Sequence, residues 1–233
     1  MSRNARATTL PGTRRELVHW CRKVWQRGWV ANHDGNLTCR LPGRKYLATP
    51  TSFSKDEIRE DDLLILDRSG KKLQGRWRPF SEVSMHLLAY NTRPDVNAVL
   101  HAHPPTATGL SVAGVGVDTT LIAEAVISLG DRIPTVPFAL PGSESQLETL
   151  ARSFPFFDAL ILGRHGVITV GKDIEQAYLR MELVEHLARI KLVAMQVGKP
   201  QYLTDHEVEI LMRKRTKGGL GPEAREVPGS PPI

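Results

Sequence analysis

An apolar stretch that ends in two histidines constrains the fold of this chain more than any other feature. Residues 96–100 read Val-Asn-Ala-Val-Leu, and His101-Ala102-His103 follows directly. A strand alternates its side chains between the two faces of a sheet, so His101 and His103 point the same way if the strand continues through them. Pro104-Pro105 comes next, where a helix or loop must begin. The sequence therefore predicts a strand that presents two imidazoles at its end, where sites of α/β proteins commonly lie.

A third histidine and an acidic residue complete a candidate metal site. His165 lies in a separate Leu-Gly-Arg-His-Gly segment, and Glu82 lies upstream in Pro-Phe-Ser-Glu. Three neutral imidazoles suffice for a catalytic metal ion with an open coordination position, and Glu82 is then either a further ligand or a base. An isolated His-x-His is weak evidence, and a structural or surface role is the simpler interpretation for most of the 8 His. His86, four residues after Glu82 on a predicted helix, is explained by a local hydrogen bond.

Length and composition describe one globular domain with a tail. The chain has 233 residues, of which 41% are hydrophobic and 24% charged, values typical of an ordinary soluble protein. No run approaches the ~18 apolar residues that span a membrane, and the basic N-terminus lacks the apolar stretch of a secretory signal. Cys21 and Cys39 form no zinc-type pair, and we do not expect a disulfide. We therefore expect a cytoplasmic protein with no membrane contact.

The positive charge is scattered rather than gathered into a nucleic-acid surface. The formal net charge is +6 and the isoelectric point is near 9.5, which permits attraction to anions. Basic residues cluster at 3–15, 71–78 and 213–217, without the interleaved aromatic residues of a single-strand binding platform. A small anionic substrate is the more economical expectation, and we do not expect nucleic acid as a partner.

Hydrophobic periodicity predicts helices and strands that are intermixed but do not alternate strictly. Helices are predicted over 13–27, 81–90, 106–112, 121–129, 144–153 and 174–197, and strands over 37–41, 46–48, 63–66, 96–101, 133–137, 159–162 and 167–170. The first two strands form a hairpin around Pro42-Gly43. Ser54, with Glu57 three residues on, is predicted to begin a further helix, and Ser81 to cap the helix over 81–90. The pattern favours a sheet flanked by helices over a doubly wound parallel fold.

The composition changes after Met212. Glycine and proline recur over residues 218–222 and 228–232, and such segments do not build regular structure. We therefore expect residues 1–212 to form the folded domain and residues 213–233 to form a flexible tail.

Four segments, taken in order, carry a family resemblance. They are Gly35-Asn36-Leu37-Thr38, then Thr49-Pro50-Thr51-Ser52, then Pro79-Phe80-Ser81-Glu82 continuing through His86 to His101, His103 and Pro104, and finally His165-Gly166-Val167-Ile168. In this order they resemble the class II aldolase/adducin family, which contains the fuculose-phosphate and ribulose-phosphate aldolases. The resemblance covers roughly residues 13–200. Each motif alone is unspecific, but their ordered combination is specific.

The resemblance implies an α/β fold with three layers, in which a mostly antiparallel central sheet lies between helices. It also implies a homotetramer with active sites near subunit interfaces, and it makes residues 1–212 a catalytic domain. His101, His103 and His165 would bind a divalent metal, usually Zn²⁺, with Mn²⁺, Co²⁺ or Fe²⁺ as alternatives. Glu82 would be the acid/base and a metal ligand when substrate is absent. Residues that would bind the substrate phosphate are Asn36, Thr51, Ser52 and Ser81.

The chemistry of these residue types agrees with a metal-dependent aldehyde-lyase. Cleaving a carbon–carbon bond beside a ketone leaves an enediolate, and Zn²⁺ held by three neutral histidines keeps most of its charge to stabilise that anion. Glu82 can then move protons at the reacting carbon. Turns rich in glycine, serine and threonine suit a phosphate, because their N–H groups and hydroxyls donate to its oxygens. Without the resemblance, Asn36, Thr51 and Ser52 are more simply interpreted as turn residues.

Three departures from the family pattern limit the assignment of a substrate. Phe80 replaces a second serine of phosphate-using members, which leaves an unphosphorylated or altered substrate open. Arg164 replaces an asparagine before the third histidine, and it either binds a substrate anion or pairs with a neighbour. The tyrosines that donate protons in aldolase members have no clear counterpart, and Glu124 is the nearest ionisable candidate.

Several functions fit the same residues. The leading expectation is retro-aldol cleavage of a hydroxyketone, in particular a ketose 1-phosphate, through a metal-stabilised enediolate. Decarboxylation or dehydration of a sugar-acid or ketose phosphate would use the same ligands. A non-catalytic, adducin-like interaction protein and an Fe(II) oxygenase are further alternatives.

Overall fold

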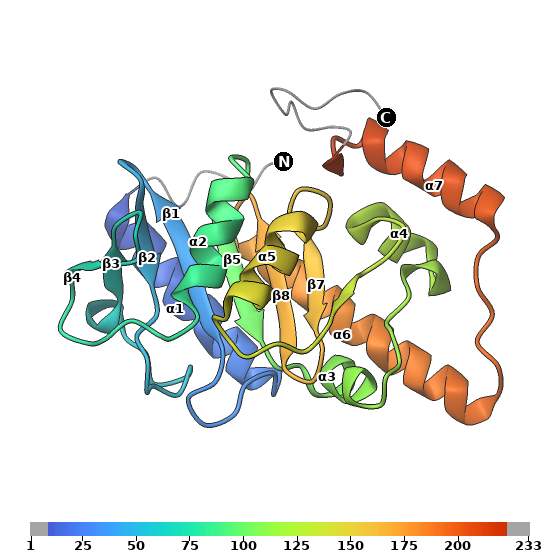
Figure 1. Ribbon diagram of the computed structural model, residues 1–233, viewed down its shortest axis with the longest axis horizontal. Coiled ribbons are helices and arrows are strands. Elements are labelled where there is room, and N and C mark those ends of the chain that lie inside the picture. Colours follow the sequence, from blue (N-terminus) through green and yellow to red (C-terminus); the bar gives the residue numbers. More distant parts are fainter. Residues whose placement is uncertain (1–8, 223–233) are drawn as a thin grey trace.

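A single eight-stranded sheet organises the protein. The computed structural model describes residues 9–222, and the strands lie in the order β4-β3-β2-β1-β5-β8-β7-β6 (Figure 1). The strands are β1 (Asn36–Leu41), β2 (Lys45–Ala48), β3 (Leu64–Leu66), β4 (Lys72–Gln74), β5 (Ala98–Ala102), β6 (Thr135–Val136), β7 (Ala159–Leu162) and β8 (Gly166–Gly171). The sheet is mixed, because β6 runs parallel to β7 whereas the other pairings are antiparallel. The predicted α/β class and the β1–β2 hairpin are confirmed.

Helices cover both faces of this sheet. In Figure 1, α2 and α5 lie in front of the strands, and α1 and α6 lie behind them. The α-helices are α1 (Leu10–Gln26), α2 (Val83–Thr92), α3 (Pro105–Val112), α4 (Ala123–Leu129), α5 (Glu144–Ser153), α6 (Ile174–Val197) and α7 (Asp205–Lys217). Two short 3-10 helices, η1 (Glu60–Asp62) and η2 (Thr119–Leu121), interrupt the connections. In the described part of the chain, no helix has both the length and the apolar character needed to cross a bilayer.

The alternation of side chains along β5 divides the interior into two apolar cores. Leu100 and Ala102 pack with α1 and α6 on one face. Val99 packs with α2 and α5 on the other, and His101 shares the face of Val99 because side chains alternate. The first histidine of the site therefore projects toward α2.

The helix predicted to begin at Ser54 does not form. Residues 55–57 make a turn, and only η1 follows. The Ser54 hydroxyl donates to the Asp56 carboxylate at 2.5 Å, instead of accepting from a helical N–H as a cap would. Lys55 and Ile58 are buried at this turn, so tertiary packing decides the conformation of the segment.

Ser81 does not cap α2. The helix begins at Val83, Glu82 occupies the N-cap position, and no side chain makes a cap hydrogen bond there. Ser81 is exposed. The prediction was wrong because the Glu82 carboxylate at this position faces the histidines rather than the helix N-terminus.

The boundary expected at Met212 lies too early. Helix α7 continues to Lys217, and its Arg215 is almost completely buried. Residues 213–217 are therefore part of the folded structure, because Arg215 has ionic and hydrogen-bonding partners in the domain. The end of the predicted tail, residues 223–233, lies outside the described residues.

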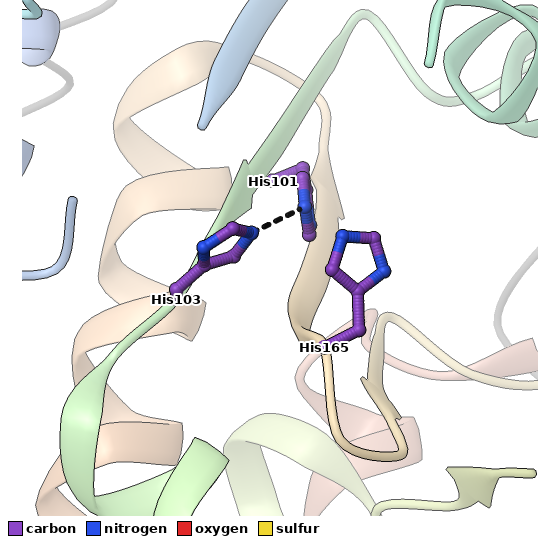
Figure 2. Close-up of side chains that lie close together, drawn as sticks. All are labelled: His101, His103 and His165. Carbon is purple, nitrogen blue, oxygen red and sulfur yellow. Dashed lines mark hydrogen bonds between the residues drawn. The ribbon is translucent and has the colours of Figure 1, made fainter. Parts of the chain in front are cut away.

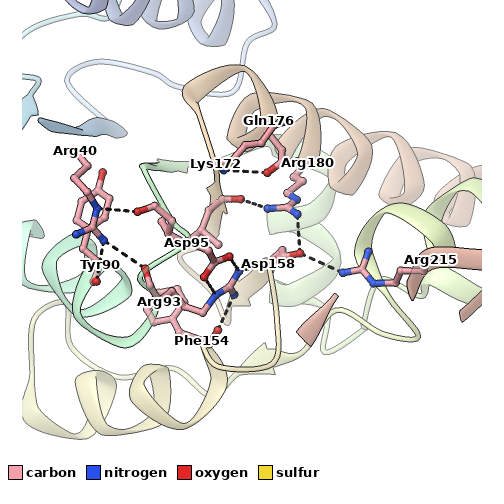
Figure 3. Close-up of polar contacts among 12 residues, drawn as sticks. Arg40, Tyr90, Arg93, Asp95, Phe154, Asp158, Lys172, Gln176, Arg180 and Arg215 are labelled. Carbon is pink, nitrogen blue, oxygen red and sulfur yellow. Dashed lines mark hydrogen bonds and ion pairs between the residues drawn. The ribbon is translucent and has the colours of Figure 1, made fainter. Parts of the chain in front are cut away.

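A buried carboxylate, Asp158, joins three arginines from distant parts of the chain (Figure 3). Its oxygens lie 3.0 Å from Arg93 Nη2, 2.7 Å from Arg180 Nη2 and 3.2 Å from Arg215 Nη2. Arg215 also donates to the carbonyl of Ile127 in α4 at 2.8 Å. Since Arg180 lies in α6 and Arg215 in α7, the carboxylate ties both C-terminal helices to the start of β7.

Asp158→Ala is expected to destabilise the protein strongly. The substitution leaves buried guanidinium groups without their shared counter-ion, and breaking a buried ion pair costs about 3–5 kcal/mol. The free energy of unfolding, measured by chemical denaturation, tests this. The control is Glu148→Ala, because Glu148 is 61% exposed and pairs with Arg152 at 3.8 Å; its loss is expected to stay within about 0.5 kcal/mol. Equal losses in the two variants would contradict the structural role of Asp158.

Candidate metal centre

The three predicted histidines converge at one end of the sheet. His101 lies in β5, His103 follows that strand, and His165 lies in the turn between β7 and β8 (Figure 2). Each offers a ring nitrogen, and these nitrogens all lie within 4.8 Å of one another. The Nε2 atoms of His101 and His103 are 3.1 Å apart. The prediction that these residues come together is confirmed.

Two of the imidazoles are oriented by a contact to their Nδ1 atom. The Nδ1–H of His101 donates to the carbonyl of Val167 at 2.9 Å, which leaves its Nε2 as the unprotonated, ligating nitrogen. His103 Nδ1 lies 3.4 Å from the carboxylate of Asp34. Partners of this kind fix the tautomer and orientation of metal-binding histidines. Asp34 was not predicted, because it stands in a turn-rich loop without a motif that points to the histidines.

Gly166 makes room for the histidine cluster. A Cβ atom at this position would lie 2.5 Å from the carbonyl oxygen of Ala102 and 2.6 Å from Cδ2 of His103. It would also approach Cε1 of His101 to 3.2 Å. The glycine after the third histidine is therefore required by the close approach of two strands and two imidazoles.

The Glu82 carboxylate lies against the cluster. Its Oε1 is 3.1 Å from His165 Nε2, and its Oε2 is 3.5 Å from His101 Nε2. Asn36 Nδ2 donates to Oε2 at 2.9 Å. Burial alone would raise the pKa of Glu82, but the interactions with His101, His165 and Asn36 outweigh it and hold this pKa well below its ordinary value. The group is thus an ionised carboxylate in the metal-free protein.

The residues present fit a divalent cation. Burial lowers the pKa of His101 to about 4, although the Glu82 carboxylate offsets part of the effect. Burial also lowers the pKa of His103, so these two imidazoles are neutral at pH 7 and able to ligate. Glu82 Oε1 is buried and lies 3.1 Å from His165 Nε2, but it accepts no hydrogen bond from the described residues. Neutral nitrogens with an adjacent unsatisfied carboxylate oxygen form a donor set that suits Zn²⁺ and similar ions.

The predicted phosphate-binding residues lie on neighbouring segments but differ in accessibility. Residues 50 and 79 form an isolated β-bridge, and the N–H of Thr51 donates to the carbonyl of Arg78 at 3.1 Å. This contact brings Thr51 and Ser52 close to the segment that contains Ser81. Ser52 and Ser81 are exposed, and Thr51 is partly exposed. Ser52 has a φ of 64°, the left-handed conformation that a tight loop requires.

Asn36 and Phe80 are both buried. Asn36 is 4% exposed; its amide nitrogen donates to Glu82 and its amide oxygen accepts from His86. The Phe80 ring packs edge-to-face against His86, with ring centroids 5.0 Å apart. Phe80 is therefore a core residue, and the phosphate role of Asn36 stays a prediction.

His86 does not bond to Glu82 as the sequence predicted. Its Nε2 lies 2.6 Å from Oδ1 of Asn36, and its Nδ1 lies 2.8 Å from Oγ1 of Thr38. Glu82 and His86 are four residues apart as predicted, but the Asn36 amide of β1 lies between their side chains. We did not predict His86 as a site residue.

Two further sequence candidates lie in different surroundings. Arg164 has a φ of 55°, its N–H donates to the Ser111 hydroxyl at 3.1 Å, and its guanidinium lies 4.8 Å from the ring centroid of Phe138. The neighbour-contact interpretation of Arg164 thus has support. Glu124 is exposed in the first turn of α4, an element that carries none of the three histidines.

Comparisons with known proteins agree with this geometry. Residues 15–192 match the family model described as Class II Aldolase and Adducin N-terminal domain. This chain belongs to the class II aldolase and adducin family. It is 32% identical to L-fuculose phosphate aldolase of Methanocaldococcus jannaschii over 80% of this chain and 99% of the relative. It is 26% identical to 5-deoxy-D-ribulose 1-phosphate aldolase of Bacillus thuringiensis over 86% of this chain and 94% of that protein.

Solved structures of family members have the same fold. An L-fuculose 1-phosphate aldolase superposes with a TM-score of 0.81 at 25% identity, over 91% of this chain and 99% of that one. YgbL of Klebsiella pneumoniae, whose suggested activities are aldolase, epimerase and decarboxylase, gives a TM-score of 0.81 at 29% identity. It covers 88% of this chain and 99% of its own.

Gly166→Ala is expected to weaken metal binding while the protein stays folded. The added methyl would displace His101 or His103, and losses of supporting geometry typically cost 10–100-fold in metal affinity. Zn²⁺ affinity from competition with a chromogenic chelator measures the effect. The control is Gly109→Ala in α3, where a Cβ would meet nothing within 4 Å. Unchanged Zn²⁺ affinity in Gly166→Ala would refute the assignment of Gly166 to the site.

Proposed function

We propose that this protein is a metal-dependent aldehyde-lyase that cleaves a ketose 1-phosphate by a retro-aldol reaction. The observation that carries the proposal is the convergence of three imidazole nitrogens beside the Glu82 carboxylate. The relatives named L-fuculose phosphate aldolase and 5-deoxy-D-ribulose 1-phosphate aldolase support the reaction class and the substrate class. Aldehyde release from a panel of ketose 1-phosphates tests the proposal.

In this proposal His101, His103 and His165 hold the divalent metal. When bound, the cation supplies positive charge that stabilises the negative charge left on the hydroxyketone fragment. The carbon–carbon bond breaks, its electron pair stays with that fragment, and the hydroxyl of the other fragment gives its proton to solvent to become an aldehyde. This loss balances the proton that the hydroxyketone carbon gains. Glu82 moves the proton that the hydroxyketone carbon must gain, because it lies beside the ligands and has an unsatisfied oxygen.

The substrate phosphate would bind at the adjoining loops that contain Thr51, Ser52 and Ser81. Their hydroxyls and the backbone N–H groups of a tight turn are donors suited to phosphate oxygens. These residues are accessible, and Asn36 has one amide hydrogen left for a substrate. Phe80 is a core residue, so in this proposal the phosphate is held without a hydroxyl at this position.

The other expectations of the sequence are proposals of the same kind. They are Zn²⁺ as the native metal, a homotetramer, a cytoplasmic location, and a three-layer class with a mostly antiparallel sheet. Cys21 and Cys39 support the location, since both are free thiols as in reducing compartments. Apolar side chains exposed on α6, including Val193 and Val197, support self-association. Metal analysis and light scattering test the metal and the oligomer.

Decarboxylation of a sugar-acid phosphate is the second candidate function. The likeness to YgbL favours keeping it, because decarboxylase is one of that protein's suggested activities. It would use the same ligands and differ in the leaving group. Release of CO₂ rather than an aldehyde distinguishes the two reactions.

Glu82→Gln is expected to keep the metal and to lose most turnover. The amide preserves shape but cannot move a proton, and a positioned acid/base contributes about 10²–10⁴-fold to the rate. Steady-state kinetics on the metal-loaded variant measures the loss. A turnover equal to that of the unmodified protein would exclude Glu82 as the acid/base.

His103→Ala is expected to abolish metal binding with little change in fold. Two imidazoles remain, which is fewer than the three protein ligands of a typical catalytic zinc site. Metal content per chain and the circular dichroism spectrum are the measurements, with His19→Ala as the control, because His19 is exposed on α1. Full metal stoichiometry in His103→Ala would contradict the ligand assignment.

A further inference from the structure

A continuous chain of buried hydrogen bonds leads away from the Glu82 carboxylate. Asn36 Nδ2 donates to Glu82 Oε2 at 2.9 Å, and Asn36 Oδ1 lies 2.6 Å from His86 Nε2. His86 Nδ1 lies 2.8 Å from the Thr38 hydroxyl, which in turn lies 2.8 Å from the Tyr90 hydroxyl. Asn36, Thr38, His86 and Tyr90 are all buried.

The direction of every bond in this chain follows from its carboxylate end. An ionised carboxylate only accepts, so the Asn36 amide nitrogen faces it and the amide oxygen faces His86. His86 must then carry its hydrogen on Nε2. Burial, assisted by His101, lowers the pKa of His86 to about 3, so the ring is neutral and Nδ1 accepts from the Thr38 hydroxyl. The Thr38 oxygen accepts from Tyr90, and all donors therefore point toward Glu82.

This hydrogen-bond chain forms because the side-chain spacing along a helix is close to the spacing along the neighbouring strand. Glu82, His86 and Tyr90 are spaced by four residues along α2, which advances about 6 Å per step at 1.5 Å per residue. Asn36 and Thr38 are spaced by two residues along β1, which advances about 6.6–6.8 Å per step. The side chains of the two elements therefore interleave one by one. No metal ligand or substrate contact is needed to explain this pairing.

We propose that His86, Thr38 and Tyr90 are positioning residues that lock the Asn36 amide and, through it, hold the Glu82 carboxylate beside the metal centre. The consequence for turnover rests on the proposed lyase function. A carboxylate that must move a proton needs a fixed position. Hydrogen-bond donors restrict its orientation more than apolar packing does, because hydrogen bonds are directional. Asn36 is the last donor of this chain in addition to any contact it makes with a substrate.

The experiment compares variants along the chain in the full-length, metal-loaded protein. Asn36→Leu and His86→Phe are expected to lower kcat by about 10–100-fold, as for lost supporting contacts around a metal site. In His86→Phe the KM is expected to change by less than about threefold, because His86 does not contact the substrate in this proposal. Thr38→Val is expected to lower kcat less than His86→Phe does, and Tyr90→Phe least of all. His86→Gln is expected to recover part of the loss, since its amide can donate to Asn36.

A structural control and a substrate-free measurement keep the test decisive. Met85→Leu alters a buried side chain of the same helix outside the hydrogen-bond chain, and its kcat per bound metal is expected to be unchanged. In a crystal structure of the His86→Phe protein, or of Thr38→Val if the former does not fold, the Glu82 carboxylate is expected to leave its place 3.1 Å from His165. An unchanged carboxylate position, or an unchanged kcat in His86→Phe, overturns the proposal. Absence of lyase activity in the unmodified protein would refute the proposed function, while the crystal structures would still decide the positioning role.

Discussion

The pairing of β5 with a strand on each edge is the constraint on which the site depends. β5 lies between β1 and β8, and the register sets Asn36 opposite His101 and His101 opposite Ile168. A slip of one residue would turn His101 to the face of α1 and α6, because side chains alternate between faces. The register also places Gly166, the first residue of β8, where His101 and His103 need space. One set of backbone hydrogen bonds therefore brings together residues from three separate segments.

The face of the sheet that carries His101 combines an apolar core with polar side chains that have partners. Met85, Val99 and Ile168 exclude water on this side, which makes an unpartnered polar group costly. The amide, imidazole and hydroxyls beside Glu82 are joined to one another instead. At the opposite end of β8 another buried polar group, the Asp158 carboxylate, is stabilised by ion pairs with three guanidinium groups. The first arrangement fixes a carboxylate at the site, and the second fixes the C-terminal helices.

Much of the fold was accessible from local patterns. The long helix α6, the β1–β2 hairpin and the strand that carries His101 were predicted from local signals: Asp173 at the helix start, the Pro42-Gly43 turn, and the apolar run over residues 96–100. The predictions for Ser54 and Ser81 failed although both carry the sequence pattern of a helix cap. In each case a tertiary contact has replaced the local one: Ser54 donates to Asp56 in a turn with buried neighbours, and Glu82 faces the histidines at the start of α2. Arg215 shows the same effect. The charged end of α7 was expected to be a tail, but it belongs to the folded domain because Arg215 pairs with the buried Asp158.

The sequence by itself determined the residue types of the candidate site, their order and the family. The His-x-His motif, His165 and Glu82 are residue types that suit few kinds of site. Their order along the chain can be read without knowing how the side chains pack. Only the tertiary structure decided that Asn36 and His86 form a pair, that Asp34 lies behind His103, and that Phe80 is enclosed in the core. The physical reason is the range of the interactions. Periodicity acts over a few residues of one element, whereas the Asn36–His86 and Asp34–His103 contacts join residues 50 and 69 positions apart, which only the completed sheet brings together.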